Sequence, residues 1–299
     1  MAPAYTDADL KKWMEVAEKA ARAAGDVIAK AFDGDKAVEH KGTVDLVTET
    51  DKACEKLVYE TIREACPDHL FIGEEESAAL GRTPDLTDAP TWLVDPLDGT
   101  TNFVHGFPFV CVCVGLAVGK KVVAGCVHAP VLGETYVAGR GKGATLNGKQ
   151  ISVSQTIDMV KGLFVTEVGV SRNAETVSAV FGRVQALLSA MRAVRATGSC
   201  AMGMVSVAMG RADAFYEIGF GGPWDCAAAS IVVEEAGGHV ADPQGGEFDV
   251  MARRVLATNG KLTAPMQDIL AGVRCGPTEP PRPGGEPEEG QGKPKRAKR

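Results

Sequence analysis

Two aspartates interrupt an apolar segment at residues 92–103, WLVDPLDGTTNF. Asp is depleted in strands and Pro96 cannot donate to a strand ladder, so we expect the strand to stop here with Asp95 and Asp98 aimed at one point. Mg²⁺ prefers hard oxygen ligands, and the Leu97 carbonyl offers a third oxygen. The segment therefore predicts a magnesium site. A turn, for which Asp-Gly is common, is the alternative.

The residues that follow this segment are suited to an anion. Gly99 permits close approach of the backbone, and Thr100 and Thr101 can open a helix whose N–H groups face a phosphate. We therefore expect metal and phosphate to meet at the same place.

Three further acidic groups can be interpreted either as part of a functional site or as ordinary residues at helix and strand ends. Asp51 stands at a predicted helix start, where the helix dipole alone favours an acidic residue by about 0.3–1 kcal/mol. The run GEEE at residues 73–76 crowds like charges at the end of a strand, which is unfavourable unless a cation or solvent relieves it. Asp225 precedes another predicted helix, where helix capping remains equally possible.

The spacing of apolar residues predicts the elements that carry these groups. An amphipathic helix from Thr6 to Ile28 starts with a capping box, and a second helix runs from about Glu49 to Cys66. Between them, HKGTVDLVTETD is typical of an irregular hairpin or loop. Apolar runs from Phe109 to Val153 predict an antiparallel meander. Short strands then alternate with helices at about 174–190, 199–209, 224–236 and 261–273, which indicates layers of sheet and helix.

Composition limits the class of partner. The 299-residue chain is 45% hydrophobic with a net charge of -7, and such a field repels nucleic acid and anionic membranes and favours cations. The N-terminus lacks the apolar core of a secretory signal, and no run approaches the roughly 18 apolar residues of a membrane span. We therefore expect a cytoplasmic protein that binds neither nucleic acid nor membrane.

Cysteine spacing and the C-terminal composition bound the domain organisation. The eight cysteines form no CxxC pair or zinc pattern, so we expect reduced structural thiols. We expect residues 1–275 to form one unit, with the antiparallel sheet and most metal ligands in 1–153 and the substrate side in 154–275. The Pro/Gly/Lys-rich segment 276–299 is expected to be disordered, and its basic end KPKRAKR is a weak import or anion-binding motif.

Six segments together resemble a known family. VDLVTETD, FIGEEES, WLVDPLDGTTNFVHGFPF, GSCAM, DAFYEI and WDCAAASIVVEEAGG occur in the order and spacing of the inositol monophosphatases, which are lithium-sensitive, Mg²⁺-dependent phosphatases. The likeness covers about Asp7 to Gly272. It implies a mixed α/β fold, the layered αβαβα sandwich of the inositol monophosphatase and fructose-1,6-bisphosphatase type, assembled as a homodimer.

The resemblance also implies a set of metal ligands. Glu74, Asp95 and the Leu97 carbonyl would hold the first Mg²⁺, while Asp95, Asp98 and Asp225 would hold a second. A third, weaker Mg²⁺ is implied near Glu74, and Li⁺ is the expected inhibitor.

The catalytic water is assigned by the same resemblance. Thr100 and Asp51 would orient a metal-activated water that hydrolyses the ester without a covalent intermediate, and Glu74, Asp95 and Asp98 complete the catalytic set. Thr100 alone is a weak base, but Asp51 accepting its proton makes the hydroxyl an oriented acceptor. Lys41 stands where the family has a lysine near the metals, with an ordinary exposed lysine as the alternative. No histidine has a nucleophile motif nearby.

The substrate side departs from the family pattern. The resemblance implies these contacts to the phosphate and polyol: Asp98, Gly99, Thr100, Gly198, Ser199, Cys200, Glu217 and Asp225. Glu217 favours a polyol because a carboxylate accepts strong hydrogen bonds from hydroxyls, although an exposed strand end is the alternative. The segment from Glu217 to Asp225 is one residue longer than the family pattern, with Gly221-Gly222-Pro223 where the family commonly has a His-containing step, so the resemblance does not carry over the substrate preference.

Two enzymatic functions and one non-enzymatic function follow from these residues. The first is Mg²⁺-dependent hydrolysis of myo-inositol monophosphates, which feeds free inositol to phosphatidylinositol signalling. The second is a sibling phosphatase for a bisphosphorylated nucleotide or a sugar phosphate, with extra cationic contacts from Arg172, Arg192 or Arg195. A non-catalytic scaffold is disfavoured because it needs none of the acidic residues.

Overall fold

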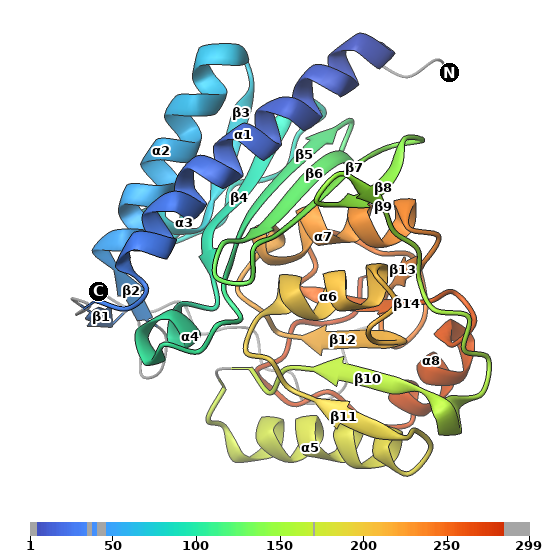
Figure 1. The fold of residues 1–299 in the computed structure, drawn as a ribbon. Coiled ribbons are helices and arrows are strands. Elements are labelled where there is room, and N and C mark those ends of the chain that lie inside the picture. The colour runs from blue at the N-terminus through green and yellow to red at the C-terminus, as the bar shows by residue number, and fades with distance from the viewer. Residues whose placement is uncertain (1–4, 35–37, 41–45, 170, 284–299) are drawn as a thin grey trace.

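The protein is built of five alternating layers of helix and sheet (Figure 1). The computed structural model describes residues 5–34, 38–40, 46–169 and 171–283. Within them a seven-stranded and a five-stranded sheet lie on either side of a central helical layer, and further helices cover the outer face of each sheet. The predicted αβαβα sandwich is confirmed.

The larger sheet has the strand order β3-β4-β5-β6-β7-β8-β9. Only the pair β3 and β4 is parallel, and the remaining neighbours form the antiparallel meander that the sequence predicts. The strands are β3 Leu70–Gly73, β4 Thr91–Asp98, β5 Cys111–Val118, β6 Lys121–Ala129, β7 Glu134–Gly139, β8 Gly143–Leu146 and β9 Lys149–Gln150.

The smaller sheet has the order β11-β10-β12-β14-β13. Strand β10 is parallel to both of its neighbours, whereas β14 is antiparallel to β12 and β13. Its strands are β10 Leu163–Thr166, β11 Ala193–Arg195, β12 Ala214–Ile218, β13 His239–Ala241 and β14 Arg254–Thr258. A separate antiparallel pair, β1 Val38–His40 and β2 Leu46–Thr48, forms the predicted hairpin, of which residues 41–45 lie outside the described residues.

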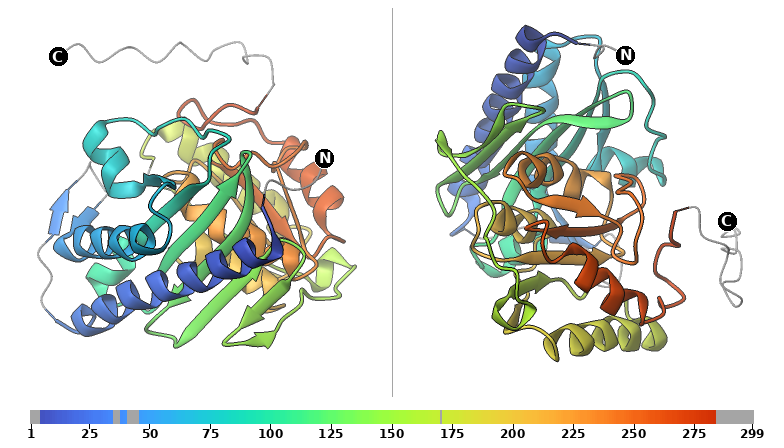
Figure 2. Two further views of the ribbon diagram at one scale, coloured as in Figure 1. Left: turned by 90° about the horizontal axis from the view of Figure 1, so that it is seen from above. Right: turned by 90° about the vertical axis from the view of Figure 1, so that its right-hand side faces the viewer.

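The helices fall into three layers and two short connectors. Helices α1 and α2 lie side by side over the outer face of the larger sheet (Figure 2), α6 and α7 lie between the sheets, and α5 and α8 cover the smaller sheet. Their bounds are α1 Asp7–Ala31, α2 Glu49–Ala65, α3 Glu74–Leu80, α4 Thr100–His105, α5 Ala174–Leu188, α6 Cys200–Ala208, α7 Pro223–Glu235 and α8 Thr263–Ala271, with a 3₁₀ turn, η1, at Met159–Lys161. No helix in the described ranges is both long and apolar enough to cross a bilayer.

Helix α7 is buried on all sides because it lies between two sheets. Its sequence PWDCAAASIVVEE has almost no polar face, which is the pattern of a fully buried helix. A Cβ on Gly115 of β5 or Gly125 of β6 would lie within 2.9 Å of α7 atoms, so glycines in the sheet and alanines in the helix allow the close packing. This close packing fixes Asp225, in the first turn of α7, against the larger sheet.

Helix α1 follows the sequence prediction closely. Thr6 and Asp9 form the capping box, with the Asp9 amide donating to Thr6 Oγ1 and the Thr6 amide donating to Asp9 Oδ2. The buried face packs on α2 and on strands β5 and β6. Local capping and apolar periodicity therefore made this helix predictable from contiguous residues, and packing on the sheet stabilises it.

The expectation that the sheet stops before Asp95 is wrong. Strand β4 continues to Asp98, and the pairing of Asp95 with Cys113 and of Asp98 with Cys111 places one extra residue on β4. The extra residue is a β-bulge, which accommodates Pro96 because a bulged residue does not donate to the ladder. The bulge, not the end of the strand, turns the two aspartates.

The three glutamates after β3 do not form the end of a strand. Glu74, Glu75 and Glu76 make the first turn of α3, with Gly73 as the residue that precedes it. Acidic side chains are favoured at that end of a helix, which relieves part of the crowding that the sequence indicated.

The start of the predicted tail is also corrected. Glu279 is buried and paired with Arg183, and the Pro280 carbonyl accepts a hydrogen bond of 3.0 Å from Arg254. Thr278 Oγ1 lies 2.8 Å from Thr176 Oγ1. Residues 276–283 therefore pack on the smaller sheet and α5, while 284–299 lie outside the described residues.

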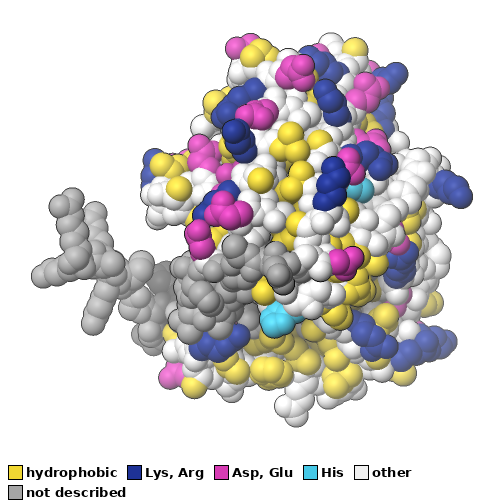
Figure 3. Space-filling model, turned by 60° about the vertical axis from the view of Figure 1, so that its left-hand side comes forward, with side chains coloured by type: hydrophobic (Ala, Val, Ile, Leu, Met, Phe, Trp, Pro, Cys, Tyr) yellow, Lys and Arg dark blue, Asp and Glu magenta, His cyan; other side chains and the backbone are white. Residues whose placement is uncertain are grey.

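The thiols match the expectation from composition. All eight cysteines are free, and every one except Cys275 is buried. On the upper part of the face seen in Figure 3, acidic and basic side chains are interspersed. The negative net charge is therefore not gathered into one patch on that part of the surface.

Candidate active site

The bulge in β4 presents three of the predicted ligand groups. Asp95 is 3% exposed, and its Oδ1 accepts a hydrogen bond of 2.9 Å from the Leu97 amide. Asp98 is 8% exposed and follows at the end of the strand. The short turn between the two aspartates holds the Leu97 backbone beside both carboxylates.

Glu74 and Asp225 join these aspartates from other elements. Burial raises the pKa of Asp95 well above its usual range, and the charges of Glu74, Asp98 and Asp225 raise it further. Burial likewise raises the pKa of Asp225, followed by the charges of Asp98 and Glu74. Carboxylates from α3, β4 and α7 are therefore near enough to raise one another's pKa, which the predicted metal site requires.

Asp98 is held by the start of helix α6. Its Oδ2 accepts hydrogen bonds of 2.6 Å from Ser199 Oγ and 2.8 Å from the Ala201 amide, and Cys111 Sγ lies 3.7 Å away. Burial raises the pKa of Asp98, although the hydrogen bonds from Ser199 and Ala201 lower it. Several donors on one oxygen fix the orientation of the carboxylate.

The unusual loop before α7 holds Asp225. The Gly221 amide donates to Asp225 Oδ2 at 2.9 Å, and Pro223 is the first residue of α7. A Cβ on Gly222 would lie 2.4 Å from the Trp224 ring, so only glycine fits there. The insertion leaves the carboxylate supported, because proline is suited to the first turn of a helix.

Thr100 and Asp51 form the predicted pair. Thr100 Oγ1 lies 3.0 Å from Asp51 Oδ1 and 3.1 Å from the Leu97 carbonyl oxygen. The other oxygen of the fully buried Asp51 accepts the Thr48 amide at 2.8 Å and also the Thr48 hydroxyl. With its proton directed to an acceptor, the Thr100 hydroxyl keeps lone pairs for a donor such as water.

Two glycine-containing segments that are distant in sequence meet beside this pair. Gly99 has φ 90°, and a Cβ there would lie 2.8 Å from the Phe109 carbonyl oxygen and 3.4 Å from that of Gly198. Asn102 bridges the two segments, because its Nδ2 donates at 2.8 Å to the carbonyls of both Phe109 and Thr197. The structure therefore brings the predicted phosphate contacts and the start of α6 together.

Glu217 reaches the same region from the smaller sheet. It is 6% exposed on β12, and its Oε2 has no hydrogen-bond partner among the described residues. Burial raises the pKa of Glu217 well above its usual range, followed by the charges of Glu167, Asp225 and Asp98. Burial raises the pKa of the nearby Cys200 thiol as well. A buried oxygen without a partner is costly, so Glu217 is suited to a ligand's donor.

The donor set fits a hard divalent cation. Within the described residues, Asp95, Asp98 and Asp225 pair with no lysine or arginine, and no three of the acids have oxygens within 4.8 Å of one another, as mutual repulsion predicts. Cys111 and Cys113 do lie within that distance of Asp98. Burial raises the pKa of both thiols, and protonated sulfur is a poor ligand for Mg²⁺.

Residues 9–274 match the inositol monophosphatase family. The chain belongs to this family. It is 53% identical over 253 residues to inositol monophosphatase 2 of Solanum lycopersicum, covering 85% of this chain and 96% of that protein. It is 48% identical to human inositol monophosphatase 1, covering 84% and 91%. The solved structure of an Anabaena inositol monophosphatase superposes with a TM-score of 0.76 at 33% identity, covering 89% and 98%.

Of the other residues weighed from the sequence of this inositol monophosphatase family member, two histidines have partners of their own. Lys41 is outside the described residues. His69 Nδ1 accepts from Trp92 Nε1 at 3.0 Å, and His128 Nδ1 lies 2.8 Å from Thr135 Oγ1, so both serve packing. The three arginines considered for a second phosphate, 172, 192 and 195, are exposed.

Sequence reasoning missed two residues that hold the loops of the site in place by hydrogen bonds. Asn102 joins two loops, and Glu167 accepts hydrogen bonds of 2.8 and 3.0 Å from the amide and hydroxyl of Thr197. Asn102 stands inside the DGTTN motif, and Glu167 is a carboxylate directly after a strand. Those positions were available as signals, but their partners are 95 and 30 residues away in the chain.

Proposed function

We propose that this chain is a Mg²⁺-dependent phosphatase that hydrolyses myo-inositol monophosphates to inositol and phosphate. The observation that carries the proposal is that the buried Asp95, Asp98 and Asp225 and the half-buried Glu74 repel one another beside the Thr100–Asp51 pair. The relatives named for this activity cover nearly the whole matched region.

The residues that would hold the cations follow from this cluster. Glu74, Asp95 and the Leu97 carbonyl are proposed for the first Mg²⁺, and Asp95, Asp98 and Asp225 for the second, with a third near Glu74. When bound, Mg²⁺ neutralises charge on the phosphoryl group and lowers the pKa of water. The oxygen donors, their burial and their mutual repulsion support this assignment.

Thr100 and Asp51 are proposed to orient the attacking water. The Thr100 proton faces Asp51 Oδ1, so the hydroxyl oxygen accepts a hydrogen bond from water and directs a lone pair of the water toward phosphorus. Asp51 stays in place because the Thr48 amide and hydroxyl hold its second oxygen. No side chain of the chain needs to bond covalently to the phosphoryl group.

The substrate would bind between the β4 bulge and the start of α6. The amides of Gly99 and Thr100 are proposed to hold the phosphate, where the absence of a side chain on Gly99 leaves the backbone accessible. Asp98, Gly198, Ser199, Cys200, Glu217 and Asp225 are proposed to line the polyol side. The buried Oε2 of Glu217 would accept a substrate hydroxyl.

Phosphate release from inositol 1-phosphate tests the proposal. The purified full-length chain with Mg²⁺ should release phosphate, and chelation of Mg²⁺ or addition of Li⁺ should stop release. No release at any Mg²⁺ concentration would rule out the activity. A panel with bisphosphorylated nucleotides and sugar phosphates ranks the alternative function, because a second phosphate needs cationic side chains, which the buried cluster of carboxylates does not supply.

Assembly and cellular place are part of the same proposal. We propose a homodimer in the cytoplasm that returns free inositol to phosphoinositide synthesis, without nucleic-acid or membrane partners. Light scattering of the purified chain measures the assembly, and a monomer at micromolar concentration would exclude the stable dimer.

A further inference from the structure

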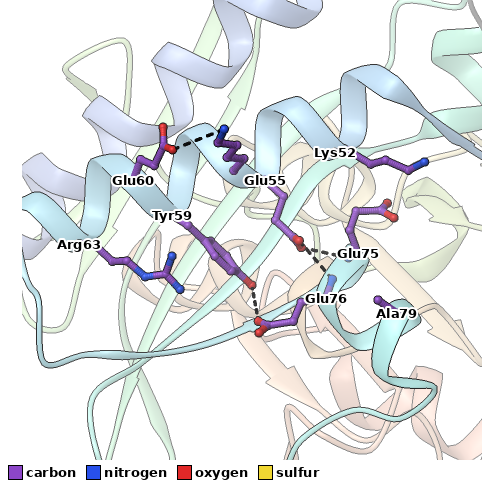
Figure 4. A pocket seen from close by; sticks show the side chains of 9 residues that line it. Lys52, Glu55, Tyr59, Glu60, Arg63, Glu75, Glu76 and Ala79 are labelled. Carbon is purple, nitrogen blue, oxygen red and sulfur yellow. Dashed lines mark hydrogen bonds and ion pairs between the residues drawn. The ribbon is translucent and has the colours of Figure 1, made fainter.

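A buried glutamate on α2 supports the start of α3, outside the cluster of carboxylates. Glu55 is 8% exposed and forms part of the wall of a surface cavity of about 540 Å³. Figure 4 shows its carboxylate pointing at the first turn of α3. Its Oε1 accepts the Glu75 amide at 2.9 Å and its Oε2 accepts the Glu76 amide at 3.1 Å.

The contact compensates for a cap that α3 lacks. Helices normally begin with a side chain that accepts from the free amides of the first turn, but Gly73 precedes α3 and has no side chain. Glu55 supplies the missing acceptors from a different helix, 20 residues away. The start of α3 is thereby tied to α2 and not only to β3.

The packing around Gly73 leaves little freedom at this junction. A Cβ on Gly73 would lie 2.1 Å from Tyr59 Oη and 2.3 Å from Glu55 Oε1, so the backbone lies directly against both side chains. Tyr59 Oη donates to Glu76 Oε2 at 3.1 Å. Arg63 lies over the rings of Tyr59 and Phe71, 5.2 and 4.9 Å from their centroids.

Glu74 follows Gly73, which lies against Glu55, and precedes Glu75 and Glu76, whose amides Glu55 accepts. Its charge is the first charge, after burial, that raises the pKa of Asp95, so Glu74 belongs with the acids of the candidate active site. The direction of a side chain follows the backbone next to it, and Glu55 holds the two residues that directly follow Glu74.

We propose that Glu55 is a positioning residue, which fixes the first turn of α3 against α2 and so directs Glu74 toward Asp95. The inference rests on the proposed role of Glu74 as a Mg²⁺ ligand. Some residues orient a metal ligand without touching the metal, and their replacement typically changes metal affinity by about 10- to 100-fold. A carboxylate used only for stability would leave the metal affinity unchanged.

The test compares two variants of Glu55 with a matched control. Glu55→Gln keeps the shape but has one accepting oxygen for two amides, and Glu55→Ala has none. Glu60→Gln is the control, because Glu60 is on the same helix and lines the same cavity but is 59% exposed and pairs only with Lys56 at 3.9 Å among the described residues. Calorimetry of each full-length protein with MgCl₂, without substrate, measures the affinity directly.

We expect Glu55→Gln to weaken Mg²⁺ binding by about 10-fold or more and Glu55→Ala to weaken it further, with Glu60→Gln unchanged. In the phosphatase assay, kcat of Glu55→Gln should return toward the wild-type value as Mg²⁺ is raised to saturation. Wild-type affinity in Glu55→Gln would overturn the inference and leave the proposed function standing. Absence of Mg²⁺ uptake by the wild-type chain would overturn both.

Discussion

Buried carboxylates in two regions of the molecule have different partners: arginines in one region and other acids in the other. In the smaller sheet, Asp242 accepts Arg254 Nε at 2.6 Å and Nη2 at 3.1 Å, and Glu279 is paired with Arg183, with all four side chains buried. In the candidate active site, the carboxylates of Asp95, Asp98 and Asp225 face other acids, and the donors in the described residues are amides, hydroxyls and thiols.

The presence or absence of an arginine partner distinguishes a carboxylate that stabilises the fold from one that is available for function. A buried carboxylate with an arginine partner has its charge balanced by the fold itself, whereas several buried carboxylates without one raise the energy of the folded state. Perturbed pKa values of that kind concentrate at functional sites. The acids in the site are therefore arranged for a cation that comes from solution.

The largest effect is expected from Asp95→Asn. Loss of a ligand shared by two proposed cations should lower phosphatase activity by on the order of 10³-fold, since bound metal contributes several kcal/mol to the transition state. Without Mg²⁺ the variant should be at least as stable as the wild type, because a charge repelled by Glu74, Asp98 and Asp225 is gone. Phosphate release and urea titration measure the two results. An active variant would remove Asp95 from the metal site.

Breaking the Arg254–Asp242 ion pair should lower stability and leave activity unchanged, which is the reverse of the result expected for Asp95→Asn. Arg254→Met leaves Asp242 charged and buried, so the free energy of unfolding should fall by about 3–5 kcal/mol while the folded fraction keeps its activity. The double variant Arg254→Met with Asp242→Leu should recover part of the loss, because no isolated charge remains. Urea titration of the three proteins checks this, and a single variant as stable as wild type would refute the distinction.

The pH dependence of stability should differ with and without Mg²⁺. Folding raises the pKa of Asp95, Asp98 and Asp225 above the ordinary value of about 4, so the cation-free folded state retains protons that the unfolded chain releases. The free energy of unfolding should therefore fall as pH rises from about 4 through the raised pKa values. Saturating Mg²⁺ should flatten or reverse this slope, because metal binds the deprotonated ligands.

Thermal melts in buffered series, with chelator or with Mg²⁺, measure that slope. Equal slopes under both conditions would contradict the convergence of the acids on a cation. Asp95→Asn is the control, because it should lose part of the slope that chelator reveals.

The smallest effect belongs to exposed pairs, which complete the comparison. Lys11 and Glu15 lie 4.0 Å apart on α1 with side chains 79% and 68% exposed. Lys11→Ala should change the free energy of unfolding by no more than about 0.5 kcal/mol and leave Mg²⁺ binding unaltered. A change above about 1 kcal/mol in urea titration would show that an exposed ion pair can stabilise the fold as much as a buried one.

Much of the fold was predictable because its causes are local. The capping box of α1, the apolar periodicity of α2 and the turn-separated runs of β5 to β7 are all present in contiguous residues. The parallel pairing of β3 with β4 was not predictable, because no local pattern names the partner of a strand. Nor was the ordered segment around Glu279, whose composition favours disorder until Arg183 and Arg254 are placed beside it.

The candidate site divides in the same way. The chain itself, by residue type and spacing, predicted Asp95, Leu97 and Asp98 as one short segment of ligand groups and Asp51 and Asp225 as acids at helix starts, but it placed Glu74 at the end of a strand. Only the tertiary structure decided that these segments converge, that Thr100 faces Asp51, and that Asn102, Glu167 and Glu55 support them. The reason is physical: a carboxylate's neighbours across a fold depend on how five layers pack, and packing is not a property of any one segment.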